Sequence, residues 1–505
     1  MHSFRHIPLG HAIPDRPHAI SVSLPTMADL IGYEERCPAV MRQVPTGYPR
    51  FVLHPFVRTL TSEFSRRHGL TGCSVWLTAT PALAEMLRGW LGGDARVVAE
   101  GALTATVFAG EPGREARAKA FLQHCGGFIS SRQAEDVLAS AGLVPVPVRE
   151  ESVDIDPLGV VKRELRRAFS GTNDDDLFVA ANGMNAVHAA FASVSAVQAP
   201  RGRTTWIQLG WLYLDTIAIL QKFTADPEND YVVVPFVHDL AALQRVLVAH
   251  EGRVAGIITE VPTNPLIQSC DLPALGALAR EHGACLVVDT SIASPWNVDV
   301  LPHADVALAS LTKYAAAEGD LLAGAVAVNP NGRNAAALRN ALVGGVALPY
   351  RRDLARLAHE IRGVGSVLAG VNAATVRVVE YLARRPEVKR IHWALAPESR
   401  ENFLRVARSP GAVGSMITFE LDPGLFAPVY DSSRLPKGPS FGLRSTLFCP
   451  FIYLGHYDLL MNAAGREQLA RHSLNPELLR LSVGLEPVDV IIDALAEALD
   501  AAKTG

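Results

Sequence analysis

The chain has 505 residues, of which 49% are hydrophobic and 19% charged, and its formal net charge is -4. It is long enough for two or three domains, and the near-neutral charge argues against a nucleic-acid-binding or membrane-surface protein. No apolar run is long enough to span a membrane and the N-terminus lacks a signal-peptide pattern, so we expect a cytoplasmic protein. The six cysteines contain no CxxC pair, which favours reduced thiols over disulfides or a metal site.

The first 150 residues divide into two segments. Prolines recur from Pro8 to Pro49 and leave little room for helix, so residues 1–70 are expected to form an extended N-terminal arm. The next segment alternates strand-like runs at 73–78 and 103–108 with helix-like runs at 81–91 and 116–124. We interpret residues 71–150 as a small α/β insertion.

The pattern becomes regular from about residue 156. Strand-like apolar runs occur at 177–180, 205–209, 231–234, 254–259, 284–289, 306–310 and 323–328. Most of the gaps between them are helix-like, for example 239–249 and 272–282. Near-continuous apolar strands alternating with helices predict a mainly parallel α/β sheet that is covered on both faces. We therefore expect a large domain over residues 151–345.

After about residue 345 the regular alternation of strands and helices gives way to long helical stretches. Helical stretches are predicted at 352–368 and 371–384, a strand at 415–421 and a final helix at 488–503. We expect a smaller C-terminal α/β domain over residues 346–505.

Polar residues follow several of the strands in the predicted large domain. One strand ends in Asp289, another in Ser310-Leu-Thr-Lys313, a third runs into Glu260-Val-Pro-Thr-Asn264, and an early strand ends in Asn182-Gly-Met184 before a helix. Open α/β sheets bind ligands beyond the carboxyl ends of their strands, so these groups should share one edge. Singly, each is more simply explained as a turn residue, a helix cap or a solvated lysine. Their order on consecutive strands favours a cofactor site.

Pyridoxal phosphate (PLP) is the cofactor that such a set suits. A lysine amine forms an imine with its aldehyde, and a carboxylate keeps its pyridine nitrogen protonated so that the ring accepts electrons. A helix N-terminus, with hydroxyl groups nearby, binds its phosphate.

Four stretches of sequence make a family resemblance specific. They are 260–266 followed by 271–275, then 287–295, 310–320 and 480–486. They resemble E-S-P-T-N-P-x…D-[IL]-x-A-[IL], V-D-N-T-F-x-S-P, S-x-T-K-Y-x-x-G-H-S-D and R-L-S-V-G-x-E of the cystathionine γ-synthase family. The resemblance covers about residue 174 to the C-terminus and a short piece near Tyr48, and it is nearest to the longer fungal-type branch. It implies PLP, a fold type I transferase with a mainly parallel seven-stranded sheet, and a homodimer or homotetramer.

The resemblance also implies roles for the matched residues. Lys313 is the Schiff-base lysine and proton shuttle, Asp289 pairs with the pyridinium nitrogen, and Arg480 grips the substrate carboxylate. Asn264 sits beside the ring oxygen, and Ser440 matches the substrate-side serine of the family's S-L-G-G segment. The expected phosphate ligands are Gly183, Met184, Ser310 and Thr312.

Two assignments from the resemblance are looser. Tyr213 falls where the family places its catalytic, ring-stacking tyrosine, and Trp211 is a rival. Tyr48-Pro-Arg50 resembles the family's Y-S-R, which reaches the phosphate from a neighbouring subunit, so no site would be complete in a monomer. The alternative is that Tyr48 and Arg50 are residues of the proline-rich arm with no role in the site.

Departures from the family pattern leave the reaction open. About 130 residues separate Arg50 from Gly183, the family's glutamate before the S-L-G-G serine is Pro439, and G-H-S-D has become Ala317-Glu-Gly-Asp. We expect γ-substitution on an activated homoserine, as in transsulfuration and methionine metabolism. The alternatives are a γ- or β-lyase that releases an oxo acid and ammonia, and a specialised-metabolism enzyme. The latter would add an unusual nucleophile to a vinylglycine-type intermediate, with S-adenosylmethionine as one donor to consider. A non-catalytic interaction module is disfavoured because the lysine, aspartate and arginine are intact.

Overall fold

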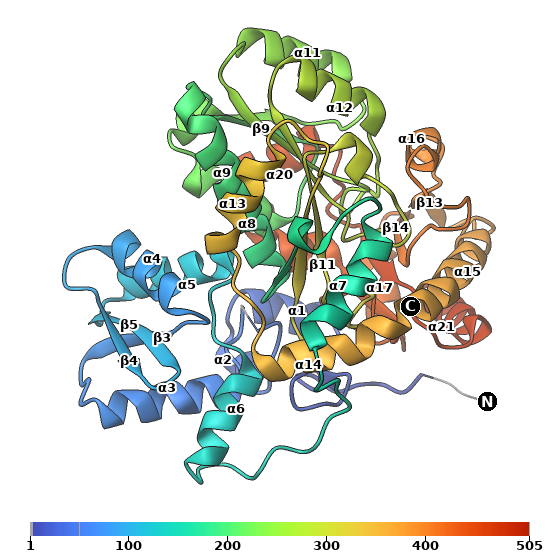
Figure 1. Ribbon diagram of the computed structural model, residues 1–505. Helices are drawn as coiled ribbons and strands as arrows, with labels where there is room; N and C mark the ends of the chain where they lie inside the picture. The colour runs from blue at the N-terminus through green and yellow to red at the C-terminus, as the bar shows by residue number, and fades with distance from the viewer. Residues whose placement is uncertain (1–3, 50, 504–505) are drawn as a thin grey trace.

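The computed structural model describes residues 4–49 and 51–503, and a seven-stranded sheet lies at its centre (Figure 1). The strand order is β6-β12-β11-β10-β9-β7-β8. The strands are β6 (Leu177–Ala180), β7 (Thr205–Leu209), β8 (Tyr231–Val234), β9 (Val254–Glu260), β10 (Cys285–Asp289), β11 (Val306–Ser310) and β12 (Gly324–Val328). Strands β7 to β11 pair in parallel, whereas β12 runs antiparallel to both of its neighbours. The predicted mainly parallel sheet is confirmed, with each predicted strand end within one residue.

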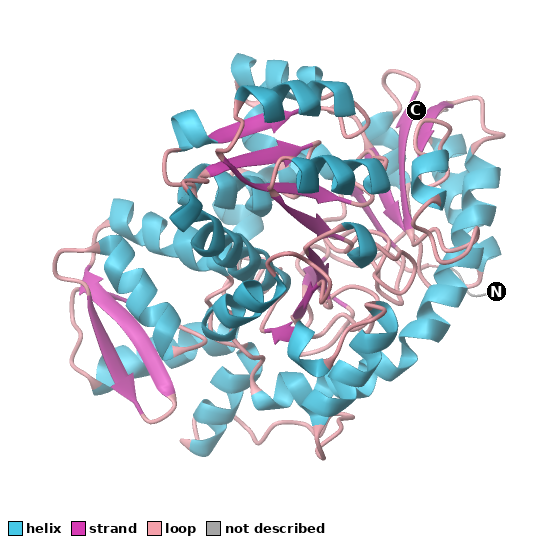
Figure 2. Ribbon diagram, turned by 45° about the horizontal axis from the view of Figure 1, so that its top comes forward, coloured by secondary structure: helices cyan, strands magenta, loops and turns pink. Residues whose placement is uncertain are grey.

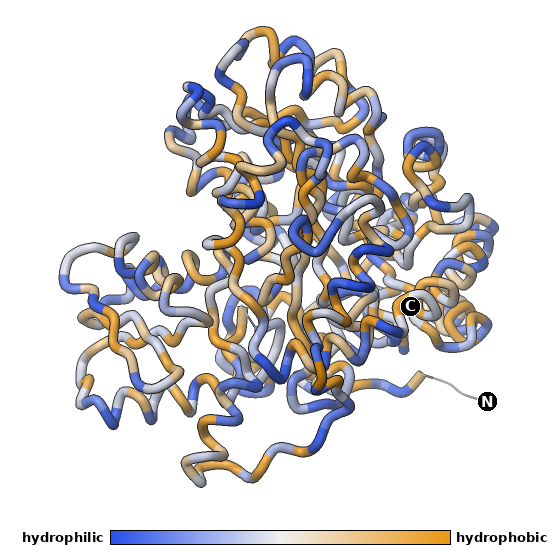
Figure 3. The backbone as a smooth tube through the Cα atoms, viewed as in Figure 1, coloured by the Kyte–Doolittle hydropathy of each residue, from blue (hydrophilic) through white to orange (hydrophobic). Residues whose placement is uncertain are grey.

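Helices lie on both faces of this sheet (Figure 2), and an apolar core packs against each face. Successive strand residues point to opposite faces, so on β10 Leu286 and Val288 join one core while Cys285 and Val287 join the other. The first core contains residues of α7 (Pro157–Ala168), α11 (Leu240–Ala249) and α12 (Leu272–Glu281). The second contains residues of α8 (Gly183–Gln198), α9 (Leu214–Phe223) and α13 (Ala335–Gly345). Burial on both faces explains the nearly continuous apolar strands at the centre of Figure 3.

A smaller domain begins with helices α14 (Arg351–Glu360) and α15 (Val364–Leu382). Its antiparallel sheet has the order β13-β14-β16-β15, formed by β13 (Val388–His392), β14 (Met416–Leu421), β15 (Leu447–Pro450) and β16 (Leu479–Ser482). Helices α15, α17 (Phe426–Ser432) and α21 (Val488–Ala501) pack on it. Arg480 therefore lies on an inner strand, held between two neighbours.

The insertion forms a separate lobe at the left of Figure 1. Its three-stranded sheet has the order β3-β5-β4, from β3 (Cys73–Leu77), β4 (Arg96–Glu100) and β5 (Leu103–Ala109). The helices are α3 (Pro55–Arg67), α4 (Pro81–Leu91), α5 (Pro112–Cys125) and α6 (Ser131–Ser140). Leu60 and Phe64 of α3 share a core with Leu77 and Val107 of the sheet. We therefore propose that α3 belongs to this unit, and that residues 151–345 and 346–505 form the large and the small domain.

The N-terminal arm contains more helix than its prolines suggested. Besides the short strands β1 (Ala12–Ile13) and β2 (Ser21–Val22), it forms α1 (Met27–Glu34) and α2 (Pro38–Met41). The expectation of an extended arm is wrong here because Pro25 and Pro38 only flank the segment that forms α1. Thr26 caps that helix by accepting a hydrogen bond from the Asp29 backbone N–H at 3.1 Å. Within the described residues, no helix is both long and apolar enough to cross a membrane.

Candidate active site

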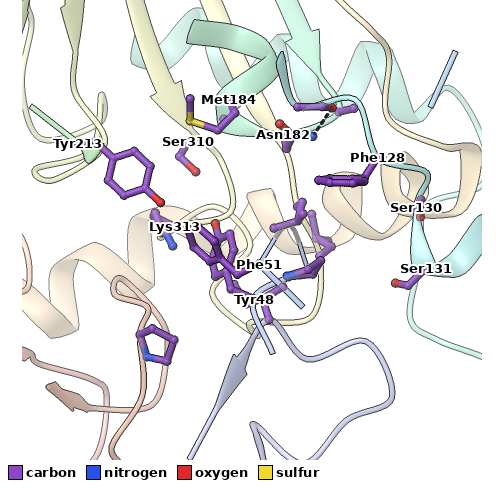
Figure 4. Close-up of a pocket in the computed structure, with 18 of the residues that line it drawn as sticks. Tyr48, Phe51, Phe128, Ser130, Ser131, Asn182, Met184, Tyr213, Ser310 and Lys313 are labelled. Carbon is purple, nitrogen blue, oxygen red and sulfur yellow. Dashed lines mark hydrogen bonds between the residues drawn. The ribbon is translucent and has the colours of Figure 1, made fainter. Parts of the chain in front are cut away.

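A cavity of about 530 Å³ lies beyond the carboxyl ends of the parallel strands (Figure 4). Every part of the chain contributes to its wall. Tyr48 comes from the arm, Phe128 from the insertion, Gly183 and Asp289 from the large domain and Arg480 from the small domain. This is the position at which open α/β sheets bind their ligands, and the volume is in the usual range for small-molecule sites.

Lys313 occupies the turn that follows β11 and is buried. Its Nζ donates a hydrogen bond to Ser440 Oγ at 2.8 Å. The same nitrogen lies 4.7 Å from the centre of the Phe441 ring and 5.1 Å from that of Tyr48. The amine is therefore fixed by one hydroxyl and two aromatic rings at the cavity wall, where a carbonyl compound could react with it.

Two carboxyl groups end neighbouring strands beside the cavity. Asp289 and Glu260 are partners in the parallel register of β10 and β9. Asp289 Oδ1 accepts a hydrogen bond from the Ser291 N–H at 2.8 Å, and Glu260 Oε1 accepts one from the Tyr213 N–H at 2.5 Å. Burial raises the pKa of Asp289, and burial together with the charge of Asp289 raises the pKa of Glu260 well above its usual range.

Such a pair favours a cation beside it, which a protonated pyridine nitrogen would supply. Asp289 was expected to face that nitrogen, whereas Glu260 was given no role from the sequence. The position of Glu260 could have been predicted from the sequence, because it ends the strand next to the one that ends in Asp289.

The first turn of α8 forms a second wall of the cavity. Gly183 and Met184 line it, and the Asn182 side chain caps the helix by accepting from the Asn185 N–H at 2.9 Å. A Cβ atom on Gly183 would lie 3.1 Å from Ser310 Oγ, so glycine allows the helix to approach the end of β11. The first N–H groups of a helix have no partner within the helix and attract anions, which suits a phosphate group. Together with the lysine and the buried carboxylates, this turn fits PLP.

Thr312 differs from the expectation that its hydroxyl faces the phosphate. Its Oγ1 donates to the Ala323 carbonyl at 3.2 Å and accepts from the Ala323 N–H at 3.0 Å. A hydroxyl has one hydrogen to donate, and here the hydrogen is used in joining the lysine turn to the start of β12. Thr312 is buried at that junction.

Arg480 is held in a largely apolar setting. Its guanidinium lies 4.4 Å from the centre of the Phe451 ring and 5.7 Å from that of Phe441. Nη1 donates to Asn264 Oδ1 at 3.3 Å, and Nη2 donates to the Ser440 carbonyl at 3.4 Å. A planar guanidinium fixed in this way can bind a carboxylate through two parallel hydrogen bonds.

Tyr213, and not its rival Trp211, faces the cavity. Figure 4 shows the Tyr213 ring beside Lys313, and Tyr213 lies at the N-cap of α9. The Trp211 ring is buried among other side chains, and its Nε1 donates to His456 Nε2 at 3.2 Å. The structure therefore offers the tyrosine for contact with a bound ring.

Tyr48 reaches the cavity of its own chain. Its ring lies against Lys313, as Figure 4 shows, so the structure brings it to the site without a second subunit. This differs from the expected arrangement, in which the tyrosine comes from a neighbouring subunit. The arm packs against the rest of the chain, where Lys437 Nζ donates to the Pro25 carbonyl at 2.6 Å. Arg50, the other expected phosphate ligand of the arm, lies outside the described residues.

Four apolar residues that line the cavity, which we call the apolar wall, were missed by the sequence reasoning. They are Pro439, Phe441, Phe451 and Leu454. Pro439 and Phe441 flank Ser440, so the only signal was the change from the family's S-L-G-G to Pro-Ser-Phe-Gly. Phe128 and Ser130 of the insertion also line the cavity and carried no signal in the sequence.

Known proteins resemble this chain in sequence and in fold. Residues 169–500 match the model of a family described as Cys/Met metabolism PLP-dependent enzyme. The chain is 39% identical over 492 residues to the L-2-amino-4-chloropent-4-enoate dechlorinase/desaturase of Streptantibioticus cattleyicolor, which covers 97% of this chain and 98% of the relative. It is 25% identical to the cystathionine gamma-synthase of Neurospora crassa, covering 98% of each chain. The solved cystathionine gamma synthase of Xanthomonas oryzae pv. oryzae has a similar fold, with a TM-score of 0.57 and 21% identity over 67% of this chain and 84% of that one.

Proposed function

Because this chain belongs to the family of Cys/Met metabolism PLP-dependent enzymes, we propose that it is a lyase that removes a compact apolar substituent, such as chlorine, from Cγ of a small α-amino acid. The observation that carries the proposal is the apolar wall beside Lys313 and Arg480. Its full-length similarity to an amino-acid dechlorinase/desaturase supports the same class of substrate.

Arg480 would orient the substrate by binding its carboxylate. With the carboxylate there, the side chain of a bound amino acid extends along Phe441 and Phe451, whose rings lie between 4.4 and 5.7 Å from the guanidinium. An apolar wall favours a chlorinated or unsaturated side chain, because the polar ester of an acylated homoserine would lose its hydration without gaining a partner. Pro439, at the position of the family's glutamate, extends this wall.

PLP, when bound, accepts the electron pair that remains when a proton leaves Cα. The buried carboxylate of Asp289 would keep the ring nitrogen protonated, and the N–H groups of Gly183 and Met184 would hold the phosphate with the Ser310 hydroxyl. Tyr213 would stack on the ring, and Asn264 would lie beside its oxygen.

Lys313 would move the protons of the reaction. Its Nζ, held by Ser440 Oγ, would accept the proton from Cα, lose it to solvent, accept a second proton from Cβ and finally return that proton to Cα. Once the Cβ proton has left, the bond from Cγ to chlorine breaks, chloride leaves with its electron pair, and a new π bond joins Cβ to Cγ. Hydrogen from Cβ and chlorine from Cγ are lost as HCl, so the product is more unsaturated without any oxidant.

A product assay tests this proposal. The holoenzyme is given L-2-amino-4-chloropent-4-enoate, and separately O-acetylhomoserine with and without cysteine, and chloride and organic products are measured. We expect chloride release that needs no added thiol and is lost in Lys313→Ala. Lys389→Ala is the matched control, because that lysine is exposed and pairs with Asp422. A product that forms only with a nucleophile, and contains it, would contradict elimination.

γ-Substitution on an activated homoserine remains the second candidate. The similarity to a cystathionine gamma-synthase over 98% of this chain favours it. The cysteine arm of the assay decides between the two, because substitution yields a thioether whereas elimination leaves the thiol unchanged.

A further inference from the structure

The insertion contacts the helix that faces the cofactor phosphate. Asn182, the N-cap of α8, donates from Nδ2 to the Gly126 carbonyl at 2.9 Å, the contact drawn as a dashed line in Figure 4. Asn185, in the first turn, donates from its side-chain amide to the Cys125 carbonyl at 3.3 Å. The end of α5 is therefore bonded to the start of α8.

The approach at this contact is close enough to require glycine. Gly126 has a φ of +65°, and a Cβ atom there would lie 2.2 Å from Asn182 Oδ1 and 2.5 Å from the Asn185 nitrogen. On its other side, Asn185 Oδ1 accepts from the Ala347 N–H at 2.8 Å. The first turn of α8 is thus clamped between the insertion and the segment that follows α13.

The clamped turn carries Gly183 and Met184, which lie between Asn182 and Asn185 in sequence and line the cavity. Their N–H directions depend on where that turn is held, and hydrogen bonds weaken steeply when donors are misaligned. We propose that the insertion positions the phosphate-binding turn of α8, with Gly126 and Asn182 as positioning residues. The proposal rests on PLP as the cofactor and not on the reaction that the enzyme performs.

A phosphate-specific consequence distinguishes this role from general support of the fold. Pyridoxal shares the ring and aldehyde of PLP but lacks the phosphate. A displaced turn should therefore weaken PLP binding while leaving pyridoxal binding nearly unchanged. General damage to the cavity would weaken both compounds alike.

The test compares Gly126→Ala with Gly142→Ala. Both glycines follow helices of the insertion and have positive φ, +65° and +70°, but a Cβ atom at Gly142 would meet nothing within 4 Å. Each apoenzyme is titrated with PLP and with pyridoxal, and binding is followed by quenching of intrinsic fluorescence. We expect Gly126→Ala to lose about tenfold or more in PLP affinity, the scale of one charge-assisted hydrogen bond, with little change for pyridoxal. Gly142→Ala should bind both as the wild type does.

Equal loss for both compounds in Gly126→Ala, or loss for neither, would overturn the proposal. If Gly126→Ala does not fold, Asn182→Ser is measured against the same criterion, because serine keeps a helix cap but its shorter side chain does not reach the Gly126 carbonyl. Its selective loss of PLP affinity would support the proposal, and unchanged selectivity would reject it. Both readouts are binding constants, so failure of the proposed γ-elimination would not alter them.

Discussion

Phe441 separates the two cationic groups of the site. Its ring centre lies 4.7 Å from the Lys313 amine and 5.7 Å from the Arg480 guanidinium, and Phe451 contacts the same guanidinium. Each contact of a cation with a ring face is worth about 0.5–2 kcal/mol, so the phenylalanine helps to set the distance between the two cations. The family resemblance places a leucine at this position, which makes Phe441 the clearest local difference on the substrate side.

Replacement of this ring should change substrate preference. Phe441→Leu removes both cation contacts and opens space beside Cγ. We expect the ratio of kcat/KM for the chlorinated amino acid to that for O-acetylhomoserine to fall about tenfold, or roughly 1.4 kcal/mol. Steady-state kinetics on both substrates measure this ratio. Phe426→Leu, in the core of the small domain, is the control. An unchanged ratio in Phe441→Leu would show that the ring does not select the substituent.

For single residues, the sequence predicted the site best where a reactive side chain ends or follows a strand. Lys313 and Asp289 could be predicted to line one cavity, because Asp289 ends a parallel strand and Lys313 follows the end of the neighbouring strand by three residues. Thr312 could not be placed in the same way, because its hydroxyl has an alternative partner in Ala323, which is brought close only by the antiparallel return of β12. The partners of Gly126 could not be predicted from its neighbours in sequence either, because Asn182 lies 56 residues away.

At the level of elements, burial decided what could be predicted. Strands of the central sheet are covered on both faces, and their unbroken apolar runs gave their limits. Strand β4 escaped prediction because its residues are exposed or only partly buried. Helix α1 was missed because prolines flank it, and β16 because only pairing with β14 and β15 defines it.

Helix α6 is joined to helix α14 by a buried arginine. Arg132 donates to both Glu150 oxygens at 2.6 and 2.8 Å and to Asp353 Oδ1 of α14 at 3.0 Å, and it is almost fully buried. Arg132→Met should remove the buried cation between these carboxylates, leaving Arg352 beside Glu150 and the Ser130 hydroxyl beside Asp353, and cost about 3–5 kcal/mol. We expect faster hydrogen exchange across α6 and a lower Tm.

Arg88→Met is the matched control in the same lobe. Arg88 pairs with Glu85 on α4 at 2.6 Å, but both side chains are about half exposed, so its loss should cost less than about 1 kcal/mol. Equal exchange rates across α6 in the two variants would contradict the role of Arg132 in holding the helix.

For the whole molecule, buried histidines predict weak resistance to acid. Burial lowers the pKa of His54, His188 and His456 to about 4, from arm, large domain and small domain respectively. Below about pH 6.5 the unfolded chain binds protons that the folded chain does not, so stability falls as pH falls toward 4. Each histidine should contribute about 1.4 kcal/mol per pH unit to that slope.

Urea unfolding at several pH values measures the slope. His456→Gln keeps an acceptor for Trp211 and removes one titrating group. The slope of the free energy of unfolding between about pH 6 and about pH 4.5 should therefore decrease by about 1.4 kcal/mol per pH unit. His11→Gln, at an exposed position, is the control. The same slope in His456→Gln and the wild type would refute the explanation.

The position of Tyr48 predicts that each active site takes this tyrosine from its own subunit. Because Tyr48 lies against Lys313 of its own chain, a mixed oligomer of Tyr48→Ala and Lys313→Ala chains should have no intact site. We expect differently tagged chains, co-purified as mixed oligomers, to be as inactive as either variant alone. Activity of about half that of a wild-type dimer would mean instead that the tyrosine contributes to the active site of a neighbouring subunit.

The position of β12 has a consequence for how the protein is made. This strand follows the lysine turn in sequence yet inserts between β11 and β6, and β6 has no other partner in the sheet. While the chain is still emerging from the ribosome, β6 must therefore wait as an unpaired edge until β12 has been translated. Arg480 is translated later still. The nascent chain should therefore capture PLP only after β12 has emerged and substrate only after β16 has emerged, and chains stalled before β12 should be targets for chaperones and proteases.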